Sequence, residues 1–169
     1  SDREGDPAIF QQRADGSGSA ERPTRPDPKS AHLPEAWSPD GKVLSFQIRT
    51  AGIASLWTLA QDGDRKPKPF GQPGTRTQAC SSFSPDGRWL AYASDEITAG
   101  TFQVFVQPVP PTGAKYQISA DASTCPAWSA DGKQLVYTRY ASRLLFSTDI
   151  RTTPGFSSGQ PTQIRADAM

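Results

Sequence analysis

Three aspartates recur in the sequence, each directly before a glycine in the strings "WSPDG", "FSPDG" and "WSADG". Three carboxylates presented by repeated units could bind a cation between them. An aspartate in a tight turn, however, accepts hydrogen bonds from nearby backbone amides, and the identical position in all three strings favours that structural role. We therefore expect no metal site, and we assign the turns to Asp40 and Gly41, Asp86 and Gly87, and Asp131 and Gly132.

Two cysteines and one histidine are the other candidates for covalent or metal chemistry. Cys80 and Cys125 lie 45 residues apart, each three residues before the aromatic residue of the recurring string. Equivalent side chains of repeated units should point the same way rather than toward each other, so we expect two buried thiols rather than a disulfide, with the redox state left open. His32 is the only histidine, and we expect it in a surface or loop-to-strand position without a catalytic role.

Several charged residues follow the strand that comes after the recurring string, and they differ between the copies. Such variation frees these positions from the structural requirements of the repeat, and loops at one end of a rigid scaffold commonly carry binding residues. The alternative is that they are solvated loop charges. The candidate ligand-binding residues are Arg49, Asp95, Glu96 and Arg139.

Charge and motifs exclude several classes of function. The formal net charge is +1, so the chain lacks the excess of Lys and Arg with which proteins neutralise phosphates, and we expect no nucleic-acid partner. No run approaches about 18 apolar residues, so we expect no membrane insertion by this segment. We find no Gly-rich nucleotide loop, His-Arg-Asp loop or Asp-Phe-Gly motif, and we expect neither enzymatic activity nor a cofactor.

The recurring string predicts the architecture that positions these residues. Gly41, Gly87 and Gly132 are spaced by 46 and 45 residues, which is the period of four-stranded propeller blades. Pro suits the second position of a type I turn, Asp suits the third, and Gly accepts the left-handed conformation that closes a hairpin with a bulge. The apolar run after each turn is typical of a central strand covered on both faces.

Each repeated unit is predicted to contain four short antiparallel strands. A helix over 88–99 is the alternative, because Trp89, Ala93 and Ile97 fall at helical spacing, but the matching runs in the other copies carry no helical stripe. The second, third and fourth strands are predicted at 43–46, 55–59 and 68–70, at 89–93, 103–107 and 116–119, and at 134–137, 144–150 and the final "QPTQI".

The amino-terminal stretch "AIFQQRADGSGSAERPT" matches only the third strand, the turn and the fourth strand of a unit. We therefore predict an all-β chain of about three and a half four-stranded blades, cut from a longer protein. The recurring aromatic residues, Trp37, Phe83 and Trp128, are predicted to pack in the core between blades. A partial blade and linker are assigned to 1–30, and whole blades to 31–73, 74–121 and 122–169.

These residues resemble the WD-like propeller repeats of the TolB type, which carry a Pro-Asp motif. Such repeats have Trp/Phe-Ser-Pro-Asp-Gly-Lys/Arg, an apolar strand ending in Phe or Tyr, and an "IW"-like or "VF"-like strand before an Asp-Gly turn. The matching ranges are Trp37–Phe46, Phe83–Tyr92 and Trp128–Tyr137. The sequence "FSPDGRWLAYASDE" is most similar to propeller regions associated with bacterial Ser/Thr protein kinases.

The resemblance implies a β-propeller that binds a ligand or a protein without catalysis, as the sensor or interaction part of a larger bacterial protein such as a Ser/Thr kinase. The alternative is an accessory, substrate-screening propeller of a prolyl-oligopeptidase-type hydrolase whose catalytic domain lies outside this segment. We expect an extracytoplasmic or periplasmic location, with the cytoplasm as the alternative. Because an arc of blades exposes its terminal faces, we expect a longer parent or self-association to close the propeller.

Overall fold

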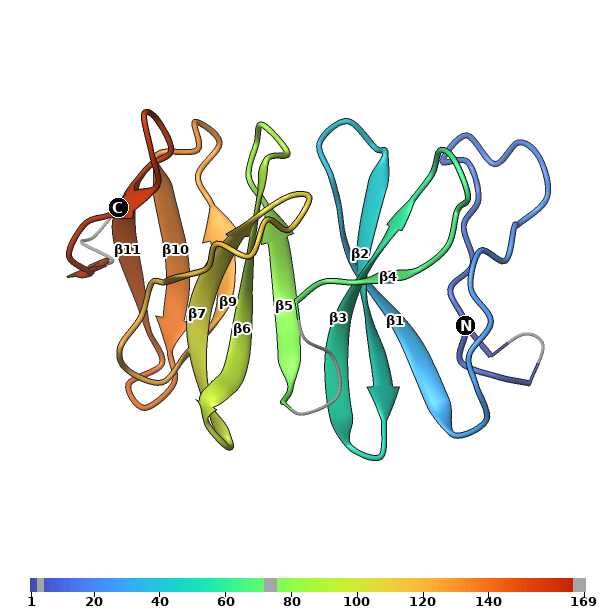
Figure 1. Cartoon of the computed structure of the whole chain (residues 1–169), viewed down its shortest axis with the longest axis horizontal. Helices are drawn as coiled ribbons and strands as arrows, with labels where there is room; N and C mark the ends of the chain where they lie inside the picture. Colours follow the sequence, from blue (N-terminus) through green and yellow to red (C-terminus); the bar gives the residue numbers. More distant parts are fainter. Residues whose placement is uncertain (3–4, 72–75, 166–169) are drawn as a thin grey trace.

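The computed structural model describes residues 1–2, 5–71 and 76–165. Within these ranges the chain contains strands and connecting turns but no helix. The strands form three antiparallel sheets, in which strands that follow each other in sequence are also neighbours, except that β13 pairs with β11 (Figure 1). The all-β prediction is confirmed, including a strand rather than a helix over Trp89–Thr98.

Sheet 1 has the strand order β1-β2-β3-β4, and sheet 2 has the order β5-β6-β7-β8. Sheet 3 contains β9, β10 and β11, and two short strands, β12 and β13, share its outer edge because both pair with β11. The bounds are β1 Ser30–Trp37, β2 Val43–Thr50, β3 Ile53–Ala60, β4 Lys68–Pro69, β5 Gln78–Phe83, β6 Trp89–Thr98, β7 Thr101–Pro108, β8 Tyr116–Gln117, β9 Ser123–Trp128, β10 Gln134–Arg139, β11 Leu144–Arg151, β12 Ser157–Ser158 and β13 Thr162–Gln163.

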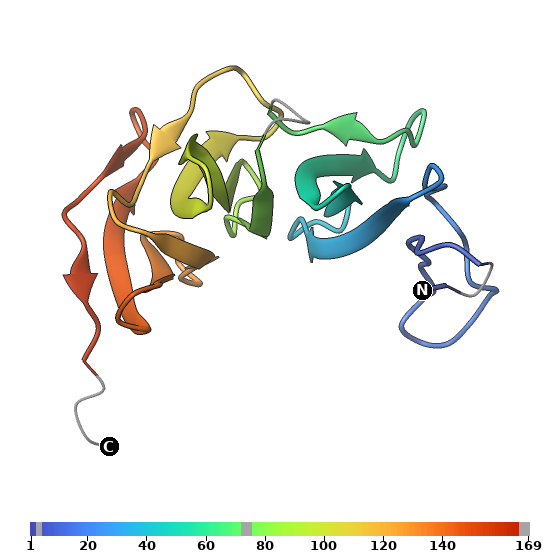
Figure 2. The ribbon, with the colours of Figure 1, turned by 90° about the horizontal axis from the view of Figure 1, so that it is seen from below.

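The three sheets follow one another along an arc (Figure 2). The first strand of each sheet lies toward the concave side of the arc, and the short last strands lie toward its convex rim. The amino-terminal segment lies at one end of the arc and the last strands of sheet 3 lie at the other. Sheet 2 therefore has a neighbouring sheet on each of its two faces.

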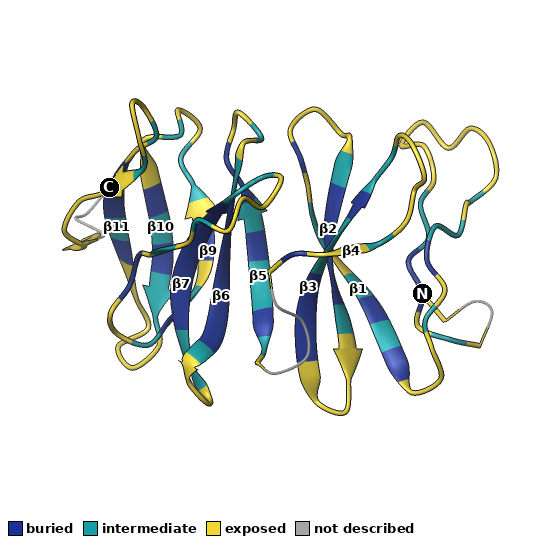
Figure 3. Ribbon diagram, in the orientation of Figure 1, coloured by how far each residue is buried: buried dark blue, intermediate teal, exposed yellow. Residues whose placement is uncertain are grey.

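Apolar side chains fill the gaps between the sheets, and the central parts of the strands are buried (Figure 3). Phe70 of sheet 1 packs edge-on against Tyr92 of sheet 2, with ring centroids 6.1 Å apart. Burying a large apolar side chain contributes about 1.5–3 kcal/mol, so these layers fix each sheet against the next. The gap between sheets 2 and 3 is filled by Ala91, Val104, Val106, Ile118, Leu135, Tyr137, Phe146 and Ile150.

The aromatic residues that open the recurring strings differ in burial. Phe83 is buried against sheet 1, and the half-buried Trp128 donates from its indole Nε1 to the carbonyl oxygen of Ser82 in the preceding sheet at 3.1 Å. Trp37 is 46% exposed, so the prediction of core packing is wrong for this residue. Trp128 thus contacts the first strand of the preceding sheet, whereas the described segment before sheet 1 provides no such strand for Trp37.

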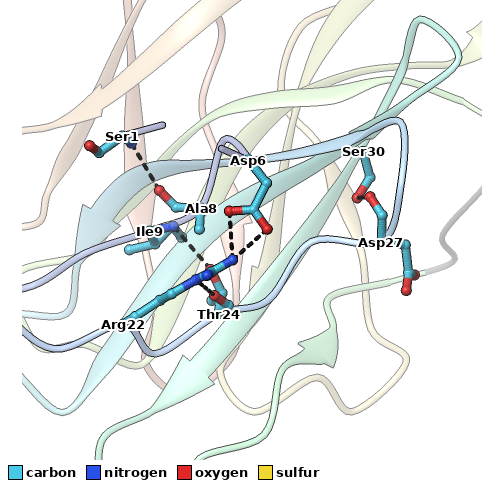
Figure 4. A network of polar contacts seen from close by, with 8 residues as sticks. All are labelled: Ser1, Asp6, Ala8, Ile9, Arg22, Thr24, Asp27 and Ser30. Atoms are coloured by element: carbon cyan, nitrogen blue, oxygen red, sulfur yellow. Dashed lines mark hydrogen bonds and ion pairs between the residues drawn. The ribbon is translucent and has the colours of Figure 1, made fainter. Parts of the chain in front are cut away.

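The segment before sheet 1 is irregular. The outer strands expected there are reduced to a single antiparallel bridge between Gln11 and Glu21. Polar contacts hold the segment together (Figure 4): Arg22 pairs with Asp6 and donates to the carbonyl oxygen of Thr24, while the Thr24 hydroxyl accepts from the backbone of Ile9 at 3.0 Å. Ile9 of this segment packs with apolar residues of sheet 1, so the segment covers part of that sheet.

All three recurring strings form the same hydrogen-bonded turn. In the first copy the N–H of Gly41 donates to the carbonyl oxygen of Ser38 at 2.8 Å, and the Ser38 hydroxyl donates to Asp40 Oδ1 at 2.6 Å. The same carboxylate oxygen accepts from the backbone of Lys42 at 3.1 Å. The three turn glycines have φ angles of 69°, 70° and 69°, in the left-handed region that favours glycine. Each aspartate therefore bonds to its own turn.

Acid should weaken these turns. The Ser129 hydroxyl and the backbone N–H of Lys133 donate to Asp131 and hold the pKa of its carboxyl below the usual value. A pKa lowered by folding gives stability that is present at neutral pH and is lost as the pH falls below about 4 through the folded-state pKa. In urea titrations from about pH 6 to about pH 3, Asp131→Asn should lose less stability than the wild type, because its amide does not titrate. Identical acid-dependent losses would contradict this role.

Candidate functional site

A cleft of about 760 Å³ lies beside sheet 2. Its walls come from the end of sheet 1 after β4, from strands β5, β6 and β7, and from the connection between β7 and β8. The polar and charged residues of the lining, together with one glycine, are Gly71, Arg76, Gln78, Ser94, Glu96, Gln107 and Lys115.

Two buried glutamines form part of the floor of this cleft. The side-chain Oε1 of Gln78 accepts a hydrogen bond from the backbone N–H of Leu56 in sheet 1 at 3.2 Å, and Gln107 Nε2 donates to the hydroxyl of Tyr92. Burial raises the pKa of Tyr92 well above its usual value, so the hydroxyl stays protonated at neutral pH. Hydrogen bonds to neighbouring strands therefore fix both amides in place.

A glycine leaves room in front of these amides. Gly71 has a φ angle of 87°, and a Cβ atom added to it would lie 3.2 Å from Gln78 Nε2 and 3.7 Å from Gln107 Nε2. The first of these distances is tighter than an ordinary carbon–nitrogen contact. A side chain at position 71 would therefore crowd the NH₂ group of Gln78.

Three charged side chains line the walls. Lys115 forms an ion pair with Glu96, and its Nζ lies 5.7 Å from the ring centroid of Phe105. Arg76 is exposed and forms no ion pair with any residue in the described ranges. The cleft thus combines one uncompensated guanidinium with amide groups, a set of donors suited to carboxylate and carbonyl oxygens.

A serine supplies the hydroxyl group of the described lining. This lining contains no His or Cys, and its serine, Ser94, donates to Glu96 Oε2 at 3.4 Å and accepts from the backbone of Glu96 at 3.2 Å. Among the residues that the structure describes there is also no group of three or more His, Cys, Asp and Glu side chains that could hold a metal ion.

Over the described ranges, no helix is long and apolar enough to cross a membrane.

The four predicted ligand-binding residues do not lie together. Glu96 lines the cleft beside sheet 2, whereas Arg49 lines a separate cleft of about 670 Å³ beside the amino-terminal segment. Arg139 forms an ion pair with Asp121 at 2.7 Å, and its guanidinium carbon lies 3.9 Å from the ring centroid of Phe146. These side chains therefore belong to three different environments along the arc.

Asp95 holds a hairpin in place. Its carboxylate accepts hydrogen bonds from the backbone N–H of Thr77 at 2.7 Å and from that of Gly100 at 2.9 Å. The residue is 9% exposed and ties the β6–β7 hairpin to the segment before β5. Both carboxylate oxygens of Asp95 already accept these backbone hydrogen bonds, so Asp95 is not part of the candidate site.

Sequence reasoning missed most of the cleft residues. Arg76 and Lys115 lie in connections of unequal length outside the recurring string, where no repeat comparison applies. Gln107 offered a signal, because it is a polar residue near the end of the otherwise apolar run of β7. A buried polar residue in such a run commonly serves a hydrogen bond or a site.

Cys80, Cys125 and His32 also differ from expectation. The two sulfur atoms lie 2.9 Å apart and Cys125 is exposed, so the expectation of buried thiols that point the same way is wrong.

His32 is 5% exposed, lies in β1 and packs against Phe46, where burial lowers its pKa. It is therefore part of the core rather than of the surface.

Comparison with known proteins places the fold. No family model matches the chain, and no curated protein matches it. A solved structure described as a TolB from Agrobacterium tumefaciens matches with a TM-score of 0.69 and 20% identity over 95% of this chain. TolB from Acinetobacter baumannii matches with a TM-score of 0.67 and 21% identity over 92% of this chain. The chain has a TolB-like β-propeller fold. Sheets 1, 2 and 3 are blades of the propeller.

A peptidase propeller is among the similar structures as well. The puromycin-hydrolyzing peptidase of Mycobacterium tuberculosis matches with a TM-score of 0.64 and 17% identity over 94% of this chain. The TolB-like chain spans 59% of the Agrobacterium protein, 37% of the Acinetobacter protein and 27% of the peptidase. It is therefore a partial propeller of a larger ring, and likeness at this level of identity shows the fold alone.

Proposed function

We propose that the chain is a non-catalytic binding segment of a larger bacterial propeller protein, and that its cleft beside sheet 2 binds a carboxylate-bearing ligand such as an acidic peptide. The observation that carries this proposal is the exposed Arg76 guanidinium in the same cleft as two side-chain amides that lie beside Gly71. A guanidinium binds a carboxylate with two parallel hydrogen bonds. Amide NH₂ groups donate to the carbonyl oxygens of a peptide.

The shape and the walls of the cleft support a short peptide segment. A volume of about 760 Å³ lies within the range of small-ligand sites, about 300–1,000 Å³. Pro69, Ile97 and Pro111 supply apolar wall surface against which aliphatic parts of a peptide can pack. The combination of apolar walls with a few fixed polar groups is typical of sites that orient a ligand.

Fluorescence anisotropy with two labelled tetrapeptides tests the proposal. A fluorescein-labelled tetraglutamate peptide should bind, and a tetralysine peptide of the same length should not. Arg76→Ala should weaken tetraglutamate binding about tenfold, the equivalent of about 1.4 kcal/mol, because it removes the unpaired guanidinium. Arg151→Ala is the matched control, since Arg151 is an exposed arginine of β11 outside the cleft.

Two results would overturn the proposal. One is the absence of tetraglutamate binding at millimolar peptide. The other is an equal affinity of the Arg76 and Arg151 variants, which would show that any attraction is spread over the surface.

The sequence resemblance favours a bacterial Ser/Thr protein kinase as the parent protein, with this chain in its sensor region outside the cytoplasm. A second candidate, an accessory propeller of a prolyl-oligopeptidase-type hydrolase, is favoured by the likeness to the mycobacterial peptidase. The complete open reading frame distinguishes the two. A kinase domain and a membrane span before the propeller support the first, and a nucleophile-elbow serine with its Asp and His after the propeller supports the second.

A further inference from the structure

Two cysteine side chains from neighbouring sheets meet on the first strands of those sheets, toward the concave side of the arc. Cys80 lies in β5 of sheet 2, Cys125 lies in β9 of sheet 3, and their sulfur atoms are 2.9 Å apart. This distance is shorter than an ordinary contact between two thiols. The two side chains therefore already converge, as a disulfide requires.

Local backbone geometry explains the convergence. The pairing of β5 with β6 shifts register between Ala79 and Ser82, and the pairing of β10 with β9 shifts between Val136 and Thr138. Each cysteine sits in the resulting bulge with a positive φ angle, 56° for Cys80 and 51° for Cys125. A bulge redirects a side chain away from the regular alternation of a strand. The two thiols thus lie at equivalent positions, each in the bulge of the first strand of its sheet.

We propose that Cys80 and Cys125 form a disulfide that links sheet 2 to sheet 3. The oxidant is a small-molecule disulfide of the oxidised glutathione class. The thiolate of one cysteine attacks this disulfide, forms a mixed disulfide and releases one glutathione thiol. The sulfur of the second cysteine then attacks the first cysteine, forms the protein disulfide and releases the second glutathione thiol. Two protein thiols are oxidised and one glutathione disulfide is reduced, with both protons passing to the two released thiols.

The environments of the two sulfur atoms set the order of attack. Cys125 is exposed and can meet the oxidant, whereas Cys80 is half-buried. Burial raises the pKa of the Cys80 thiol to about 11, which makes it the weaker first nucleophile. The Thr124 hydroxyl lies 3.6 Å from Cys125 Sγ and 3.9 Å from Cys80 Sγ. Cys125 therefore reacts first, and Cys80 resolves the mixed disulfide.

The expected result of the link is a more stable arc. The disulfide closes a loop between two blades, so it restricts the unfolded chain and keeps the adjacent blades together. Because the two cysteines lie 45 residues apart, the disulfide should raise the thermal midpoint of the oxidised protein by about 5–10 °C relative to the reduced protein.

Mass spectrometry and thermal unfolding of the full chain test the proposal. After incubation with oxidised glutathione, the monomer should lose the mass of two hydrogen atoms, and a non-reducing peptide map should show Cys80 joined to Cys125. Cys80→Ser should instead retain glutathione on Cys125, and Cys125→Ser should react more slowly than Cys80→Ser. Neither variant should show a thermal midpoint that depends on oxidation.

Other outcomes would overturn the proposal. These are glutathione on both cysteines of the wild type, two free thiols after incubation, or a disulfide found only between two chains. An oxidised wild type with the thermal midpoint of the reduced protein would refute the stabilising role of the link.

Discussion

Replacing Gly87 by valine should lower the free energy of unfolding by about 2–4 kcal/mol. Gly87 has a φ angle of 70°, a conformation that a β-branched residue adopts only with strain. A Cβ atom at this position would lie 3.6 Å from Pro39 Cδ in the turn of the preceding blade, so the valine methyl groups would meet that ring. The substitution therefore disturbs both a turn and the contact between two blades.

Gly41→Val is the matched control for this substitution. Gly41 has a φ angle of 69°, and a Cβ atom there would have no neighbouring heavy atom within 4 Å. This variant should show the backbone strain alone, a loss of about 1–2 kcal/mol in urea unfolding. Equal losses in the two variants would show that the contact between turns contributes nothing. No loss in either would contradict the left-handed turn.

The same turns explain why the fold could be predicted from the sequence. Pro39, Asp40 and Gly41 act within one tight turn, and each residue type has a local preference that does not depend on distant contacts. Three copies at a constant period then require one supersecondary unit to repeat, and a four-stranded blade fits that period. The prediction of an all-β, TolB-like propeller is confirmed because its evidence was local and repeated.

The candidate site could not be predicted in this way, because it depends on where unequal connections meet. Gly71, Arg76 and Lys115 come from two connections that the repeat does not constrain, and only the folded chain brings them together. Cys80 and Cys125 show a different limit. The repeat correctly indicates that they are equivalent, but the bulges that redirect their side chains are not visible in a pattern of alternating residues.

One carboxylate joins the first two blades at the same level as the cysteines. Glu35 of β1 accepts hydrogen bonds from the backbone N–H of Cys80 at 2.7 Å and from that of Ser81 at 2.8 Å, and it also accepts from the side chain of Gln47. Both backbone donors lie in the bulge of β5. Glu35 therefore satisfies two amides that the sheet ladder leaves unpaired and links sheet 1 to sheet 2.

Glu35→Ala should destabilise the chain by about 2–4 kcal/mol, because it leaves two partly buried backbone donors and the amide of Gln47 without their acceptor. Glu35→Gln is the control: it keeps one acceptor oxygen without the charge and should lose about half as much. Urea unfolding measures the losses, and hydrogen exchange should quicken at the amides of Cys80 and Ser81 in the alanine variant. Wild-type stability of Glu35→Ala, or unchanged exchange at both amides, would show that this carboxylate does not hold the two blades together.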